Sequence, residues 1–168
     1  DQNLSMNIAR KMFAKRFPDI PLDDKSLNEL MGIEGARVKT LYGSLAQKYG
    51  VQWHGRQYEP GSYQKGDLLN QNLTFLNSVL YGLCTSVIHH IGLSPYIGFI
   101  HSNSPLPFVY DIADLYKSYY TIDLAFQLTA TGATNFQRKE AIDAFQKRAN
   151  EFGLLENIVW DIREIMEL

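Results

Sequence analysis

One histidine and two aspartates lie in a short apolar stretch of this 168-residue sequence, IGFIHSNSPLPFVYDIAD. His101 is followed by Asp111 and Asp114, which are three positions apart and would therefore be neighbours on the surface of a helix. Carboxylates in apolar surroundings need a hydrogen-bond network, a partner cation or a metal ion. An imidazole beside carboxylates makes a mixed nitrogen and oxygen site, which suits Mg²⁺ or Mn²⁺.

A further acidic candidate, Glu34, lies in the segment MGIEGARV. Its carboxylate would continue an apolar helical stripe formed by Val38, Leu41 and Leu45. These acids also have an ordinary explanation, because the helix dipole alone favours acidic residues in a first turn. Spacing by itself therefore leaves two interpretations open, a metal site and a set of solvated helix ends.

The apolar residues recur mostly with the period of 3.6, which predicts an all-α fold. Capping-box spacing at Ser26 to Glu29 and at Thr134 to Gln137 marks two helix starts. Residues 50–66 are polar and rich in turn formers, and we expect a loop there, with room for a short hairpin. The expected helices span residues 3–17, a short segment from 26, 32–49, 67–91, 107–126, 135–151 and 154–167.

The composition is that of a soluble globular protein, with 45% hydrophobic and 20% charged residues. A net charge of −2 argues against a strongly basic nucleic-acid-binding protein, although it permits local basic patches. Four basic residues near the start, Arg10, Lys11, Lys15 and Arg16, are expected to lie mostly on solvated helix faces. No apolar run approaches the ~18 residues of a membrane span. The single Cys84 suits a reducing cytosol, so we expect a cytoplasmic protein without membrane contact.

Four features together resemble the CRISPR-associated integrase family, the metal-dependent DNA enzymes of spacer acquisition, and especially its type I-E members. Three are the segments IEGARVKTLYGSLAQKYGVQWHGRQYEPG, KGDLLNQNLTFLNSVLYGLC and SPYIGFIHSNSPLPFVYDIADLYK. The fourth is the spacing between them, and together they cover residues 32–126 in one order. Because the motifs occur in combination, the resemblance is specific.

The resemblance implies a single Mg²⁺ or Mn²⁺ ion with three ligands, Glu34, His101 and Asp114. These three side chains should then converge in space, although they are far apart in the sequence. Asp111 matches a supporting acid, even though the helical stripe alone would place it slightly deeper than Asp114. Tyr81 and Lys117 match positions near the active site. The resemblance therefore assigns roles that spacing left open.

The implied activity is the insertion of foreign DNA fragments into a CRISPR array, by attack of a 3′-OH group on a phosphodiester. With water or on a branched intermediate, the same site would act as an endonuclease. Arg37, Arg56 and Lys117 are candidate DNA contacts. The implied partners are prespacer and repeat DNA, a second copy of the protein and a small ferredoxin-like subunit, in a prokaryotic cytoplasm. Two rival functions are a helical interaction module without catalysis and a metal-dependent hydrolase of small phosphoesters.

The expected organisation is one helical catalytic domain over residues 1–168. Residues 1–31 would form a linker and N-terminal helices, residues 32–126 the catalytic core, and residues 135–168 the C-terminal helices. The family's β-rich N-terminal domain matches no part of this sequence. We therefore expect the catalytic lobe alone, whose own activity and dimerisation would depend on surfaces outside it.

Overall fold

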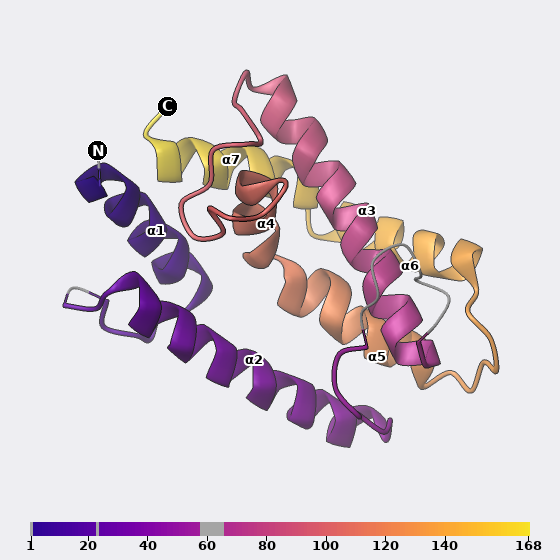
Figure 1. Ribbon diagram of the computed structural model, residues 1–168. Coiled ribbons are helices and arrows are strands. Elements are labelled where there is room, and N and C mark those ends of the chain that lie inside the picture. Colours follow the sequence, from indigo (N-terminus) through magenta and orange to yellow (C-terminus); the bar gives the residue numbers. More distant parts are fainter. Residues whose placement is uncertain (1, 23, 58–65) are drawn as a thin grey trace. The chain divides into compact units, whose positions relative to one another are not determined.

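The computed structural model describes residues 2–22, 24–57 and 66–168, and the described residues form helices and loops without strands (Figure 1). The prediction of an all-α fold is confirmed. Of the loop expected over residues 50–66, residues 58–65 lie outside the described residues, and residues 50–57 contain no strand. The possible hairpin stays a prediction. The elements are α1 (Gln2–Arg16), α2 (Leu27–Tyr49), α3 (Leu68–His90), α4 (Pro107–Asp114), the π-helix η1 (Ser118–Asp123), α5 (Leu124–Thr129), α6 (Arg138–Glu151) and α7 (Leu154–Met166).

The chain divides into two compact units. The first unit comprises Asp1–Arg37, Tyr81–Leu115 and Gly153–Leu168, and the second comprises Val38–Leu80 and Tyr116–Phe152. Helices α2 and α3 therefore contribute residues to both units. The partition into N-terminal helices, catalytic core and C-terminal helices stays a prediction.

In the first unit, helix α1 contacts both α4 and α7. Phe13, Phe17 and Leu30 form a buried cluster, against which Ile100 packs from the loop before α4. Lys15 of α1 also forms ion pairs with two acids of α7, Asp161 at 2.8 Å and Glu164 at 2.7 Å. Apolar burial and these pairs fix the C-terminal end of α1, which carries Arg16.

Helix α2 begins at the predicted capping box. The backbone N–H and the hydroxyl of Ser26 both donate to Glu29, at 2.8 and 2.6 Å. The predicted break between a short helix and a separate one at residue 32 is wrong, because α2 runs unbroken from Leu27 to Tyr49. A glycine inside a helix costs only about 1 kcal/mol, and Gly32 is accommodated.

The capping box predicted at Thr134 is also wrong, since α6 begins at Arg138 and Gln137 makes no side-chain capping bond.

The helix predicted over 107–126 is three elements, α4, η1 and α5. After Asp114 the regular α-helical hydrogen-bond pattern is interrupted. The N–H of Leu115 donates to the carbonyl of Ile112, three residues back, at 3.2 Å. The hydroxyl of Thr121 then donates to the Lys117 carbonyl at 3.1 Å, a bond that competes with the regular helical ladder. The apolar helical spacing expected along residues 107–126 therefore holds within α4, where Phe108 and Ile112 are buried, and fails at Tyr119, which is 43% exposed.

Asp123 organises the second unit. Its carboxylate accepts hydrogen bonds from Lys48 at 3.1 Å and Tyr49 at 3.0 Å, both on α2, and from Arg148 of α6 at 3.0 Å. Burial alone would raise the pKa of Asp123, but these three donors outweigh it and lower the pKa. The ionised carboxylate therefore links η1 to two other helices of this unit.

The lowered pKa of Asp123 predicts a loss of stability in acid. The group binds its proton more weakly in the folded than in the unfolded protein, so its contribution is complete above the ordinary pKa of 3.8. The contribution is lost as the pH falls from there through the folded pKa. Asp123→Asn should lower the free energy of unfolding by about 1–3 kcal/mol at neutral pH. Urea unfolding at a series of pH values should show this difference shrinking in acid, and a constant difference would contradict the prediction.

Candidate active site

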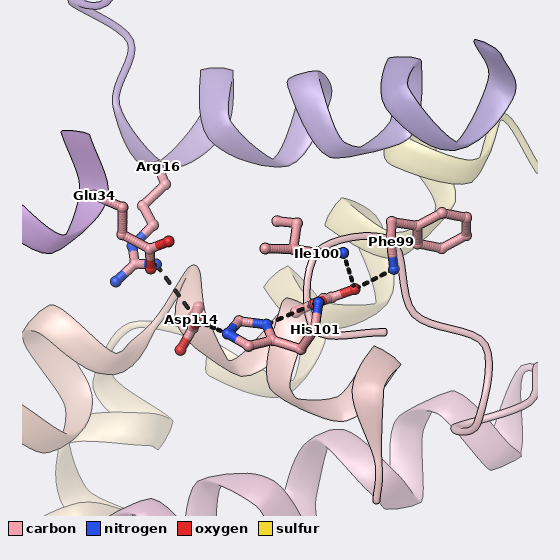
Figure 2. A network of polar contacts seen from close by, with 7 residues as sticks. Arg16, Glu34, Phe99, Ile100, His101 and Asp114 are labelled. Carbon is pink, nitrogen blue, oxygen red and sulfur yellow. Dashed lines mark hydrogen bonds and ion pairs between the residues drawn. The ribbon is translucent and has the colours of Figure 1, made fainter. Parts of the chain in front are cut away.

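A buried carboxylate organises the loop before α4. Asp111 has no exposed side-chain surface, and it accepts hydrogen bonds from three consecutive backbone N–H groups (Figure 2). The distances are 2.6 Å from Phe99, 3.1 Å from Ile100 and 3.0 Å from His101. Such a set of donors stabilises the ionised carboxylate inside the protein, where an unpaired charge would be costly.

The same loop is held close to the start of α4 by its small residue, Gly98. A Cβ atom at Gly98 would lie 2.3 Å from the Cβ of Pro107, so only glycine permits this approach. Pro107 occupies the first turn of α4, where its missing N–H costs no helical bond. Phe108 N–H donates to the Pro95 carbonyl at 3.2 Å, and the rings of Phe99 and Phe108 meet edge to face at 5.8 Å. Packing and backbone bonds together fix the loop.

His101 is oriented at both ring nitrogens. Nδ1 lies 2.7 Å from Asp111 Oδ1, and Nε2 lies 3.5 Å from Asp114 Oδ2. The hydrogen bond with Asp111 and the nearby charge of Asp114 raise the pKa of His101, against the opposing effect of burial. An imidazole that donates one ring N–H to a carboxylate presents its other nitrogen in a fixed direction, which is the usual arrangement of a metal-binding histidine.

Glu34 and Asp114 meet at a third residue, Arg16. Its guanidinium Nη1 forms an ion pair with Glu34 Oε1 and lies 3.6 Å from Asp114 Oδ2 (Figure 2). Burial raises the pKa of Glu34, because the loss of solvent outweighs the favourable charge of Arg16. The structure thus brings together the three side chains that the resemblance implied as ligands, Glu34, His101 and Asp114.

Arg16 corrects the expectation of a solvated face, since only 8% of its side chain is exposed. The guanidinium carbon lies 5.1 Å from the ring centre of Phe17. Sequence reasoning gave no site role to this arginine, because its only signal was a basic pair at the end of a helix. Its burial depends on the packing of α1 and α4, which the local pattern does not contain.

Two carboxylates and an imidazole are suitable donors for Mg²⁺ or Mn²⁺, and the fixed Nε2 of His101 supports that fit. The donors are nevertheless not arranged around an ion, because Arg16 lies between the two carboxylates. Within residues 2–22, 24–57 and 66–168, no three acidic, histidine or cysteine side chains are placed to hold a metal. The residue types therefore fit a metal. For a metal ion to bind both carboxylates, the ion pairs with Arg16 would have to separate.

Two tyrosines extend the site. Tyr81 of α3 packs edge to face against Tyr110 of α4, with ring centres 4.9 Å apart, and Tyr110 meets the imidazole of His101 at 6.4 Å. The ring of Tyr110 therefore contacts both the ring of Tyr81 and the imidazole of His101. Tyr110 was not predicted as a site residue, although its position directly before Asp111 was a usable signal.

The predicted DNA contacts have internal partners. Arg37 forms an ion pair with Asp19 in the first unit. Arg56, in the second unit, donates to the Asn70 side chain at 2.9 Å and to the Thr74 hydroxyl at 2.9 Å. Lys117 belongs to the second unit and directly precedes η1. Their role as DNA contacts, like the roles of Tyr81 and Asp111 in the reaction, stays a prediction.

No helix in the described part of the chain combines the length and the apolar character that crossing a membrane requires.

The profile of the family "CRISPR associated protein Cas1" matches residues 2–154. The "CRISPR-associated endonuclease Cas1 2" of Chlorobaculum tepidum is 49% identical over 162 residues, which are 96% of this chain and 55% of that protein. The "CRISPR-associated endonuclease Cas1" of Escherichia coli K12 is 43% identical over 128 residues, 76% of this chain and 42% of that protein.

The chain thus spans about half the length of the curated relatives it matches. Among solved structures, "Crystal structure of TtCas1-DNA complex" is similar with a TM-score of 0.88 and 33% sequence identity. The match covers 98% of this chain and 61% of the other. Sequence and fold agree over nearly the whole chain, and the chain belongs to the CRISPR-associated Cas1 family.

Proposed function

We propose that the first unit carries the catalytic centre of a metal-dependent DNA endonuclease and integrase that inserts DNA fragments into a CRISPR array. The observation that carries the proposal is the imidazole of His101, fixed by buried Asp111 and directed toward Asp114. The names of the relatives, CRISPR-associated endonucleases, support the activity. The similar Cas1–DNA complex supports DNA as the substrate.

The proposed ligands are Glu34, His101 and Asp114, and the proposed ion is Mg²⁺ or Mn²⁺. When bound, the ion would polarise a DNA phosphate and offset the charge of the five-coordinate transition state. Asp111 acts as a positioning residue, because its bond to Nδ1 leaves Nε2 as the nitrogen that faces the site. Tyr110 and Tyr81 limit the movement of the imidazole from the side.

The proposed reaction is a transesterification. The 3′-OH of the incoming DNA gives its proton to water and its oxygen bonds to the phosphorus of the target strand. The bond from phosphorus to the target's own 3′ oxygen breaks, and that oxygen takes up a proton from water to become a new 3′-OH. Water in place of the 3′-OH would give simple cleavage. We further propose that Arg37, Arg56 and Lys117 contact DNA, and that a second copy and a small ferredoxin-like subunit complete the assembly.

The test uses the protein at its natural length and a branched DNA that mimics the integration intermediate. Radiolabelled strands should be cleaved and rejoined in the presence of Mg²⁺ or Mn²⁺ and left intact when EDTA is added. A phosphomonoester, p-nitrophenyl phosphate, should remain unhydrolysed under the same conditions. Hydrolysis of the monoester with intact DNA would instead favour a hydrolase of small substrates, and activity on neither would contradict the proposed catalysis.

A further inference from the structure

We propose that Arg16 is a competitor of the divalent metal, so that metal binding requires its guanidinium to leave the space between Glu34 and Asp114. This inference rests on the proposed metal site and extends it. It concerns a residue of α1 that belongs to none of the segments in which the ligands lie.

The first argument is the position of a single nitrogen atom. Nη1 of Arg16 contacts Glu34 Oε1 and lies 3.6 Å from Asp114 Oδ2, and Asp114 Oδ2 is also the oxygen nearest to Nε2 of His101. A Mg²⁺ ion held by these oxygen atoms would lie about 2.0–2.1 Å from them. Nη1 and a metal ion on the same oxygen atoms would be two positive charges in close contact, and like charges at such a separation repel each other.

The second argument is space. The cavity beside Arg16 and Asp114 has a volume of about 10 Å³, close to the minimum for one water molecule. It is also lined by Asp111 and four apolar residues, and neither Glu34 nor His101 lines it. Mg²⁺ keeps several of its waters when it binds to proteins. This neighbouring cavity has no room for a hydrated ion, so an ion held by Glu34 and Asp114 would take the place of the guanidinium.

The third argument is charge. Arg16 supplies one positive charge to the buried carboxylate of Asp114 and the partly buried carboxylate of Glu34, whereas a divalent ion would supply two. The arginine is also incompletely satisfied, because its Nε is buried without a hydrogen-bond acceptor among the described residues. A buried donor without a partner lowers the stability of the closed arrangement. The exchange of Arg16 for a metal is thus favoured by charge and opposed by the lost ion pair and by the partial dehydration of the metal ion.

A purely structural role predicts the opposite result. If Arg16 held Glu34 and Asp114 in their metal-binding positions, its removal would weaken metal binding. Competition predicts tighter binding, because removal of a competitor leaves both carboxylates available. The direction of the change in affinity therefore distinguishes the two roles.

The experiment is a titration of the DNA-free protein at its natural length with Mn²⁺, followed by calorimetry and by the electron paramagnetic resonance signal of free Mn²⁺. Arg16→Gln should bind Mn²⁺ at least about tenfold more tightly than the wild type, within the usual range of coupling between two sites. Arg10→Gln is the matched control. Arg10 lies on the same helix, and its Nε is also buried without an acceptor among the described residues, but its guanidinium donates to the Lys25 carbonyl at 3.2 Å. Its Mn²⁺ affinity should equal that of the wild type.

Arg16→Lys, which keeps a charge but lacks the planar fork, should give an intermediate affinity. If Arg16→Gln is unfolded without metal, Mn²⁺ should restore its helical circular dichroism at concentrations below the wild-type dissociation constant. Unchanged or weaker Mn²⁺ binding by a folded Arg16→Gln would overturn the competition while leaving the metal site in place. Absence of binding by both proteins would instead overturn the proposed metal site itself.

Discussion

Replacement of Asp111 by alanine is expected to lower the free energy of unfolding by about 3–5 kcal/mol, as for the loss of one partner in other buried charged networks. The carboxylate accepts four hydrogen bonds, from three backbone N–H groups and from His101 Nδ1. All four donors would lose an acceptor whose side chain has no exposed surface. Chemical denaturation monitored by circular dichroism measures the change.

The control for this substitution is Asp143→Ala. Asp143 is also a helical aspartate, but it is 56% exposed and pairs with Lys139 one turn earlier. Its loss should change the free energy of unfolding by no more than about 0.5 kcal/mol. Asp111→Asn should fall between the two, because an amide oxygen can accept some of the four bonds but its NH₂ group cannot. A loss below about 1 kcal/mol for Asp111→Ala would mean that the loop finds other acceptors.

The second large effect concerns the reaction. Glu34→Gln in the protein at its natural length should reduce metal-dependent cleavage of branched DNA by at least about 100-fold, the usual consequence of losing one preorganised electrostatic group. The glutamine has nearly the same shape but no negative charge, so it can still accept a bond from Arg16 while it holds a divalent cation poorly. Gel analysis of labelled DNA, at saturating and at limiting Mn²⁺, measures the effect.

Glu29→Gln is the matched control for Glu34→Gln. Both residues lie on α2, and a glutamine can replace Glu29 in the capping box with Ser26. Glu29→Gln should therefore retain wild-type cleavage, and thermal unfolding should show both variants folded. Full activity of a folded Glu34→Gln would remove Glu34 from the proposed ligands and leave His101 and Asp114 to be tested alone.

Most helices could be predicted from the sequence because periodicity is a local property. The helices at residues 2–16, 68–90 and 154–166 follow the pattern closely. The π-helix η1 could not be predicted in this way. The hydroxyl of Thr121 in η1 donates to Asn77 of α3, and this contact joins residues that are far apart in the sequence. The unbroken α2 was missed because the segment from residue 26 was taken as a short helix and a separate helix was started at residue 32.

The candidate site was predictable only in part. The resemblance identified Glu34, His101 and Asp114, and the structure brings them together. The partners of Asp111 could not be predicted, because backbone N–H groups leave no trace in residue types. Arg16 was missed for a related reason, since its ion pair joins α1 to α2 and α4 through tertiary packing.

The loop before α4 has a consequence for sequence variation. Asp111 binds the amides of Phe99 and Ile100, while their side chains pack elsewhere, on Phe108 and on the cluster of Phe13. The two positions can therefore accept other apolar residues of similar volume without altering the carboxylate's bonds. Gly98 and Asp111 have no such freedom, because one allows the close approach to Pro107 and the other is the shared acceptor. Tolerance to substitution in this loop is thus set by the backbone, and its two least replaceable residues are outside the proposed set of metal ligands.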